Sequence, residues 1–129
     1  MVQIPENLRE LLEKPIVCGL ATVMPDGQPQ VTPVWFDYDG QYMRVNTAKG
    51  RQKYYNMKRD SKVSILVIDP ANTGHWIEVR GHIVEAIEGQ QGDEHINALS
   101  HRYEGKDFSK PAAQIRVTYK IAIDKVNGQ

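Results

Sequence analysis

A basic segment, residues 49–62, holds the side chains whose types and spacing best fit the binding of an anion. It carries six Lys or Arg residues and one acid, Asp60, so its net charge is +5. The rest of this formally neutral chain must therefore carry −5. The basic residues are Lys49, Arg51, Lys53, Lys58, Arg59 and Lys62. The neutral total thus conceals one positive segment on an acidic background.

A loop that contains Gly50 leads into this segment, and the spacing of Tyr54 and Met57 predicts that a helix follows it. A helix that begins there would present unpaired backbone N–H groups and about half a positive charge. Thr47, Arg51 and Lys53 could add charge-assisted hydrogen bonds, so we expect a phosphate group to bind there. A solvated helix face with no ligand is the alternative.

A second candidate is the stretch Gln30-Val31-Thr32-Pro33-Val34-Trp35, where a proline interrupts a strand pattern. Proline has no N–H for the strand ladder, so this strand must lie at a sheet edge or contain a bulge, with backbone groups free for a ligand. Trp35 and Trp76 could stack on a planar ring, although large aromatic side chains more often serve as core or dimer contacts.

Most motifs of enzyme chemistry are absent. The sequence contains no G-x-G-x-x-G, G-x-x-x-x-G-K-[ST], H-E-x-x-H or G-x-S-x-G pattern, so it lacks the signatures of Rossmann, P-loop, zincin and hydrolase-elbow proteins. The four histidines show no metal-ligand spacing, and we expect no metal site. No catalytic acid, base or nucleophile can be assigned from the residues.

Composition points to one folded, soluble domain over residues 1–129. The chain is 40% hydrophobic and 25% charged, as globular domains are. Zero net charge argues against nucleic acid as a partner, although a small nucleic-acid-binding barrel that uses Trp35, Tyr54 and Tyr55 is a remote alternative. The lone Cys18 lies among apolar residues and is expected to be buried. No signal-peptide or membrane-spanning run is present, so we expect a cytoplasmic protein with no membrane partner.

Strands must position most of these residues. Alternating or apolar patterns predict six strands, over residues 16–24, 30–38, 41–47, 62–69, 76–87 and 115–124. The nearly continuous apolar run at 62–69 implies burial on both faces. In the last strand, Arg116 and Thr118 alternate with apolar residues and fall on the opposite face from them.

Three short helices complete the prediction: an N-terminal one carrying Leu8, Leu11 and Leu12, one over residues 50–60, and one carrying Ile96, Leu99 and Tyr103. Six strands joined largely as hairpins, with helices this short, predict a mainly β fold. Its architecture would be an antiparallel barrel or closed sandwich, which leaves few exposed sheet edges.

The order of several short motifs resembles a known family, the pyridoxamine 5′-phosphate oxidase-like split-barrel proteins, which are flavin- or deazaflavin-dependent oxidoreductases. The motifs span nearly the whole chain: Leu20-Ala21-Thr22, Pro29-Gln30-Val31-Thr32-Pro33-Val34-Trp35, Val45-Asn46-Thr47-Ala48-Lys49-Gly50-Arg51, Val67-Ile68-Asp69-Pro70 and Glu78-Val79-Arg80-Gly81. The resemblance implies a six-stranded antiparallel split barrel of the FMN-binding type. It also implies a homodimer with the cofactor at the interface.

Carried over residue by residue, the resemblance implies two groups of cofactor-binding residues. The group that would hold phosphate is Thr47, Lys49, Arg51 and Lys53, and the group that would border the flavin or deazaflavin ring is Gln30, Thr32, Pro33 and Val34. In the oxidases the phosphate loop is closer to T-N-x-x-S-R-K. The Asn-Thr-Ala-Lys-Gly-Arg form here is more similar to the subgroup that uses coenzyme F-420, so we expect coenzyme F-420 ahead of FMN.

The resemblance therefore implies a reductase that transfers hydride between this cofactor and a small organic acceptor. The oxidases carry a C-terminal extension with substrate-binding residues, and this sequence ends soon after its last strand, so oxidation of pyridoxine phosphate is not expected. The alternative is a non-catalytic protein that binds or carries flavin, haem or another tetrapyrrole on the same barrel.

Overall fold

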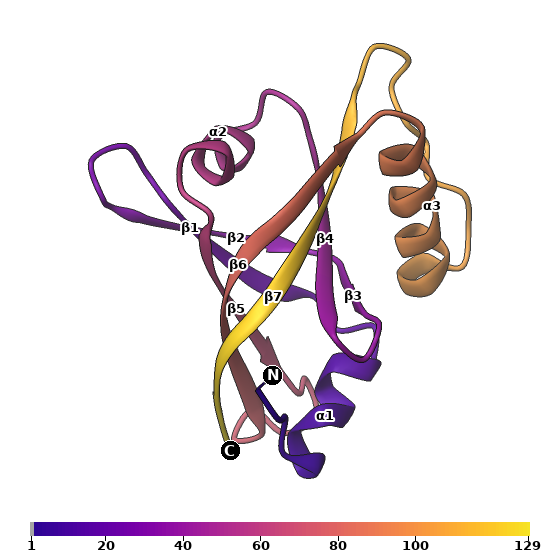
Figure 1. The fold of residues 1–129 in the computed structure, drawn as a ribbon. Coiled ribbons are helices and arrows are strands. Elements are labelled where there is room, and N and C mark those ends of the chain that lie inside the picture. Colours follow the sequence, from indigo (N-terminus) through magenta and orange to yellow (C-terminus); the bar gives the residue numbers. More distant parts are fainter. Residues whose placement is uncertain (1) are drawn as a thin grey trace.

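The computed structural model describes residues 2–129, in which seven strands form one curled antiparallel sheet, a half-barrel, with three helices against it (Figure 1). The helices are α1 (Glu6–Glu13), α2 (Gln52–Arg59) and α3 (Gln90–Glu104). The strands are β1 (Cys18–Val23), β2 (Pro29–Val34), β3 (Phe36–Tyr38), β4 (Tyr42–Ala48), β5 (Lys62–Ile68), β6 (Trp76–Glu88) and β7 (Arg116–Gly128). The three predicted helices and the mainly β class are confirmed.

The predicted count of six strands was wrong, because the segment 30–38 forms two strands rather than one. β2 pairs with β1 and β3 pairs with β4, and the order across the sheet is β2-β1-β5-β6-β7-β4-β3. The two edge strands are thus separated by a single residue, Trp35. Because one residue spans less than about 4 Å of chain, the sheet must curl until its two edges nearly meet.

Pro33 lies in β2, at the edge of the sheet, where the missing N–H costs no ladder hydrogen bond. The prediction that this proline requires an edge or a bulge is confirmed. The break in pairing comes two residues later at Trp35, because β2 has reached the end of its register with β1, where Val34 pairs with Cys18.

The concave side of the sheet encloses the hydrophobic core, which includes Leu20, Phe36, Met43, Ile65 and Ile121. Figure 1 places α1 at the lower end of the sheet, α2 near its upper end and α3 beside β7 and β4. Cys18 belongs to the core as expected, and burial raises the pKa of its thiol to about 12. A thiol so protonated is not a nucleophile.

The prediction that the strand over residues 62–69 is buried on both faces was wrong. In β5 only alternate residues are buried, and Leu66 and Ile68 are 40% and 39% exposed because they point from the outer face of the sheet. At the start of β7, by contrast, both faces are buried: Arg116 and Thr118 are buried as well as their apolar neighbours. Helix α3 packs on this part of β7 and removes its polar face from water.

The close approach of α3 to β7 depends on Gly92. A Cβ atom added to Gly92 would fall on the carbonyl group of Arg116. We therefore expect Gly92→Ala to lower the free energy of unfolding by about 1–3 kcal/mol, which exceeds the gain of up to about 1 kcal/mol from better helix propensity. Urea denaturation measures this. Gly74→Ala is the control, because its Cβ would meet no atom nearer than 3.5 Å. An unchanged Gly92→Ala protein would contradict the packing.

Candidate functional site

A cavity of about 340 Å³ lies where the β2–β3 junction, α2 and α3 come together. Its size is in the range of small-molecule sites. One wall is apolar and contains Val17, Pro33, Val34, Trp35, Ile96, Leu99 and Phe108. The other is polar and contains Asn46, Arg51, Lys53 and Arg116. The cavity thus combines a surface for a flat apolar ring with a cluster of cations.

Trp35 in the apolar wall is held in place by α3. Its ring stacks on that of Tyr103, with centroids 5.3 Å apart and planes 13° from parallel. The hydroxyl of Tyr103 donates to the carbonyl oxygen of Ile16 at 2.8 Å and accepts from the N–H of Phe36 at 3.1 Å. The backbone of α3 fixes one end of Tyr103 and these two hydrogen bonds fix its hydroxyl end, so Trp35 is held in place in the cavity wall.

Lys53 is a buried cation on the first turn of α2. It is 9% exposed, and its Nζ donates to Thr32 Oγ1 at 3.0 Å. Burial, together with the positive charges of Arg51 and Arg116, lowers the pKa of this lysine. Arg51 occupies the N-cap position of α2, where no side chain caps the helix. The N–H of Tyr54 already donates to the Arg51 carbonyl oxygen, at 3.0 Å, so it is the N–H groups of Gln52 and Lys53 that remain available to an anion.

Arg116, at the start of β7, completes the cluster and is 4% exposed. Its Nε donates to Asn46 Oδ1 at 2.8 Å, and its guanidinium lies 5.1 Å from the centre of the Phe108 ring. Burial, followed by repulsion from Arg51, lowers the pKa of Arg116 to about 10. Of the three causes Asp93 has the smallest effect, and it raises the pKa of Arg116.

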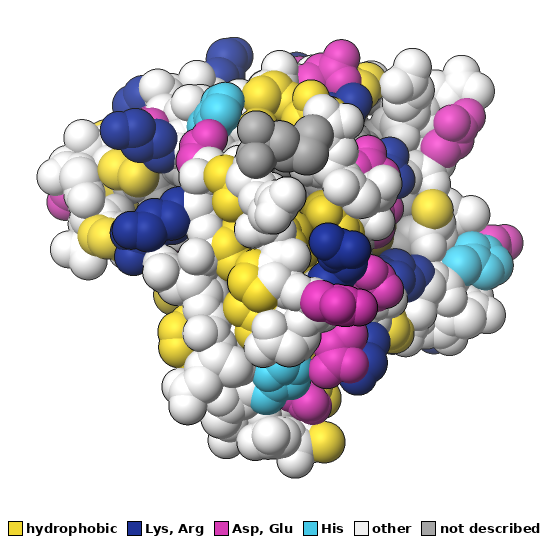
Figure 2. All heavy atoms as spheres, turned by 60° about the horizontal axis from the view of Figure 1, so that its bottom comes forward, with side chains coloured by type: hydrophobic (Ala, Val, Ile, Leu, Met, Phe, Trp, Pro, Cys, Tyr) yellow, Lys and Arg dark blue, Asp and Glu magenta, His cyan; other side chains and the backbone are white. Residues whose placement is uncertain are grey.

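No carboxylate pairs with any of these cations: within residues 2–129, none of the ion pairs includes Arg51, Lys53 or Arg116. Charges removed from water without a counterion are costly, and such uncompensated clusters mark anion-binding sites. Figure 2 shows Lys and Arg side chains on its left side, where Figure 1 places the β1–β2 turn, and others among Asp and Glu at its centre and right. The cavity is therefore suited to an anion.

The structure brings together four of the predicted cofactor residues in the cavity lining: Pro33, Val34, Arg51 and Lys53. Thr32 is joined to them through its hydrogen bond with Lys53. The other three predicted residues lie outside the lining, each for a different reason.

Lys49 forms an ion pair with Glu88, with 3.0 Å between Nζ and Oε1. Gln30 accepts hydrogen bonds from Thr22 and Asn56 through Oε1, at 3.2 Å each. Thr47 is 1% exposed, and its hydroxyl makes no hydrogen bond within the described part of the chain. Its strand neighbour Asn46, which was not singled out from the sequence, does reach the cavity.

Sequence reasoning missed Arg116 because strand alternation placed it only on the face opposite to the apolar residues, with nothing to link it to the basic segment. The register pairs Arg116 with Ala48, just before the loop that contains Arg51, and so brings a third cation to the cluster. A lone arginine at the start of an amphipathic strand carries no local signal of this. The pairing of β4 with β7 would have been needed to find it.

Residues 2–129 hold neither a cluster of metal ligands nor a helix that could span a membrane. No group of three or more His, Cys, Asp or Glu residues in this range is arranged to hold a metal ion. No helix in the same range is both long and apolar enough to span a membrane.

Comparison with known proteins gives a consistent result. A family model described as pyridoxamine 5′-phosphate oxidase matches residues 4–129. A solved structure described as an F-420 reductase is 36% identical to this chain, with a TM-score of 0.87 over 96% of this chain and 98% of that one. No curated protein matches.

More distant solved structures share the fold alone. A conserved hypothetical protein from Mycobacterium tuberculosis is 21% identical, with a TM-score of 0.77 over 99% of this chain and 85% of that one. HupZ from group A Streptococcus is 17% identical, with a TM-score of 0.66 over 98% of this chain and 94% of that one.

The repulsion inside the cluster predicts that Lys53→Met stabilises the protein at neutral pH, by about 1 kcal/mol, because an uncompensated buried cation is replaced by an apolar side chain. The folded-state pKa of Lys53 is lowered. The native wild type therefore loses this charge, and its penalty, as pH rises through that pKa, while the unfolded chain still holds the proton. The advantage of Lys53→Met should then shrink.

Urea denaturation of both proteins between about pH 7 and pH 10 tests this. Lys58→Met is the matched control, because Lys58 lies on the same helix and is exposed. A Lys53→Met variant less stable than the wild type at neutral pH would mean that the cluster is not under repulsion.

Proposed function

Because this chain belongs to the pyridoxamine 5′-phosphate oxidase-like split-barrel family, we propose that it is an oxidoreductase that binds coenzyme F-420 or FMN in the cavity between α2 and α3. The proposed reaction is hydride transfer between the cofactor and a small organic acceptor. Residues 1–129 would act as one cofactor-binding domain.

The observation that carries this proposal is the cluster of Arg51, Lys53 and Arg116 beside an apolar wall. Both cofactors join a flat tricyclic ring to an anionic phosphate. The three cations fit the phosphate, because its negative charge would relieve their mutual repulsion. The wall formed around Pro33 and Trp35 fits the ring.

A bound flavin or deazaflavin supplies the hydride chemistry itself, so the protein need only bind, orient and shield it. In this proposal the edge strand β2 borders the ring through Pro33 and Val34. The lining residues include no catalytic acid or base, which is compatible with a cofactor that supplies the hydride chemistry itself.

The other residues that the sequence predicts to bind the cofactor do not line the cavity, so each would contribute indirectly or after a change in its contacts. Thr32 would act by holding Lys53, and Gln30 by holding Asn56 on α2. Lys49 would have to leave Glu88 before it could reach a phosphate. The buried hydroxyl of Thr47, which has no hydrogen-bond partner within residues 2–129, would need to become accessible to reach a phosphate.

Preference for coenzyme F-420 over FMN is supported by the 36% identity to a structure described as an F-420 reductase. That identity spans nearly the full length of both chains. The Asn46-Thr47-Ala48-Lys49-Gly50-Arg51 form of the loop points the same way.

We also propose that the protein is a homodimer, with a second copy covering the outer face of β2, β1 and β5. This face carries Val31, which is 69% exposed, together with Leu66 and Ile68. Between Val31 and Leu66 the small residues Gly19 and Ala21 leave a hollow of about 320 Å³. Exposed apolar surface of this kind is typical of protein interfaces.

Titration of the purified protein with coenzyme F-420 and with FMN tests cofactor binding. We expect Lys53→Ala to weaken binding at least about tenfold, since a charge-assisted hydrogen bond is lost, while the weaker binding of riboflavin, which lacks the phosphate, stays unchanged. Lys58→Ala, an exposed change on the same helix, should leave both affinities as they are.

Failure of both cofactors to bind at micromolar concentration would overturn the proposal. If a cofactor binds but its reduced form transfers no hydride to any quinone or enone acceptor, the alternative of a non-catalytic carrier is favoured instead.

Sedimentation or light scattering tests the homodimer. We expect Val31→Glu to raise the dimer dissociation constant by at least about tenfold, because it places a charge within the apolar face. Val84→Glu is the matched control, since Val84 is 47% exposed but lies outside the hollow. A wild-type protein that is monomeric at micromolar concentration would contradict this proposal.

A further inference from the structure

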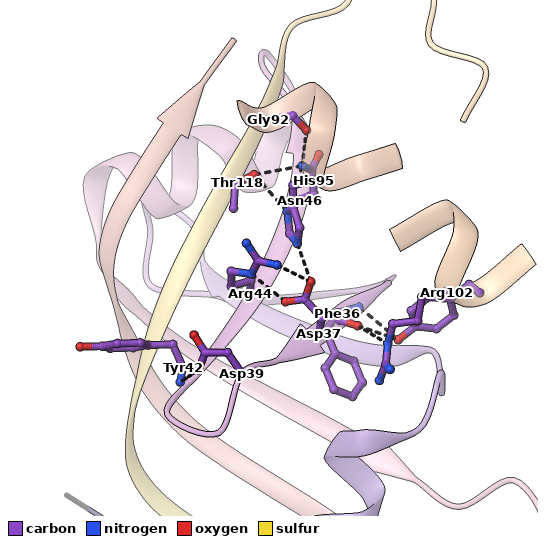
Figure 3. Close-up of polar contacts among 11 residues, drawn as sticks. Phe36, Asp37, Asp39, Tyr42, Arg44, Asn46, Gly92, His95, Arg102 and Thr118 are labelled. Atoms are coloured by element: carbon purple, nitrogen blue, oxygen red, sulfur yellow. Dashed lines mark hydrogen bonds and ion pairs between the residues drawn. The ribbon is translucent and has the colours of Figure 1, made fainter. Parts of the chain in front are cut away.

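We propose that Asp37 and His95 are positioning residues for the anion site, which act through Asn46 to hold the guanidinium of Arg116 in the cavity. Figure 3 shows Asp37, His95 and Asn46. Neither residue lines the cavity. The inference rests on the proposed function in taking this cavity as the place where a cofactor phosphate binds.

Arg116 needs an anchor. It is repelled by Arg51, and within residues 2–129 it has no carboxylate partner that would fix it. Its long side chain has many rotamers, and repulsion favours those that lead away from the cluster. The 2.8 Å hydrogen bond from its Nε to Asn46 Oδ1 opposes that motion from a buried position. A longer bond from Nη1 to Gln114 Oε1, at 3.2 Å, and the Phe108 ring add to it, but both contacts are only partly buried.

Asn46 can hold Arg116 only if its amide oxygen faces the guanidinium. The Nδ2 group donates to the carbonyl oxygen of Gly92 at 2.9 Å, which fixes the amide in this orientation. The same Nδ2 lies 3.3 Å from His95 Nδ1. An unprotonated Nδ1 accepts from it, whereas an Nδ1–H would face a second donor and favour the flipped amide.

His95 is buried, and its tautomer is set from the other side of the ring. Its Nε2 lies 3.1 Å from Asp37 Oδ2, so Nε2 carries the proton and Nδ1 is left as an acceptor. Thr118 supplies a second donor to Nδ1, at 3.0 Å. Figure 3 shows this sequence of contacts running from β3 through α3 to β4.

Asp37 is suited to this role because it stays ionised. Burial alone would raise its pKa, but hydrogen bonds from His95 and from Arg44 outweigh burial, and the pKa lies below its ordinary value. Arg44 donates to both carboxylate oxygens at 2.8 Å, so the carboxylate is held in one orientation.

A comparison within α3 shows that the arrangement around His95 differs from a surface pair. His101 lies on the same helix and contacts Asp107 at 2.6 Å, but its side chain is 52% exposed and that of Asp107 is 85% exposed. The His95 side chain is 3% exposed and joins three other elements of the fold. His101→Gln is therefore a matched control.

The first test needs no ligand. Heteronuclear NMR detects the Nε–H of Arg116, assigned by its loss in Arg116→Lys. In His95→Gln the new side chain has no acceptor at the Nδ1 position, so we expect solvent exchange of this Nε–H to accelerate at least about tenfold. His95→Asn places an amide oxygen near that position and should restore slow exchange, and His101→Gln should not alter it.

The second test measures affinity for FMN and riboflavin. His95→Gln should weaken FMN binding about tenfold and leave riboflavin binding unchanged. Arg116→Gln should have the same effect, and the double variant should show no further loss. Asp37→Asn, a nearly isosteric change, should have the same effect, because the amide can donate to Nε2 and so select the wrong tautomer. If the protein binds coenzyme F-420 rather than FMN, the affinities compared are those for coenzyme F-420 and for its deazaflavin chromophore without the phosphate.

The outcomes separate the two proposals. If the wild type binds neither cofactor, the proposed function fails, and the exchange measurement still decides the role of His95. If exchange and the FMN-to-riboflavin ratio are unchanged in both His95→Gln and Asp37→Asn, the positioning role is wrong. Should His95→Gln not fold, Asp37→Asn alone decides between these results.

Discussion

Repulsion among three cations is the interaction around which this site is built. Arg51, Lys53 and Arg116 share one cavity, burial strips Lys53 and Arg116 of water, and no carboxylate within residues 2–129 neutralises them. Left alone, such side chains would separate. The fold must therefore hold them in place by other contacts, and under the proposed function a bound phosphate would relieve their repulsion.

Each cation is held by a different element. Arg51 is placed by the start of α2, Lys53 is held by Thr32 of the edge strand, and Arg116 is held by Asn46 across the β4–β7 pair. These elements meet because the sheet curls. Its edges, β2 and β3, are joined by Trp35 alone, so the curl that encloses the core also brings the apolar wall beside the cations.

The polar residues between α3 and the sheet serve the same end. A buried polar contact is costly unless its members are satisfied, and around Asn46 nearly every donor finds an acceptor. The pattern is typical of a functional site, where stability is given up to keep groups in an unfavourable arrangement. The unpaired hydroxyl of Thr47, in the same strand, fits this interpretation.

The sequence by itself determined most of the elements and two of the three cations in the cavity. Local patterns placed the helices and most strands within a few residues, and charge counting found Arg51 and Lys53, because these features depend on near neighbours in the chain. Tertiary structure alone decided the break at Trp35, the exposure of Leu66 and the burial of Arg116. These depend on which strand pairs with which and on what α3 covers, and such long-range contacts leave no trace in a local pattern.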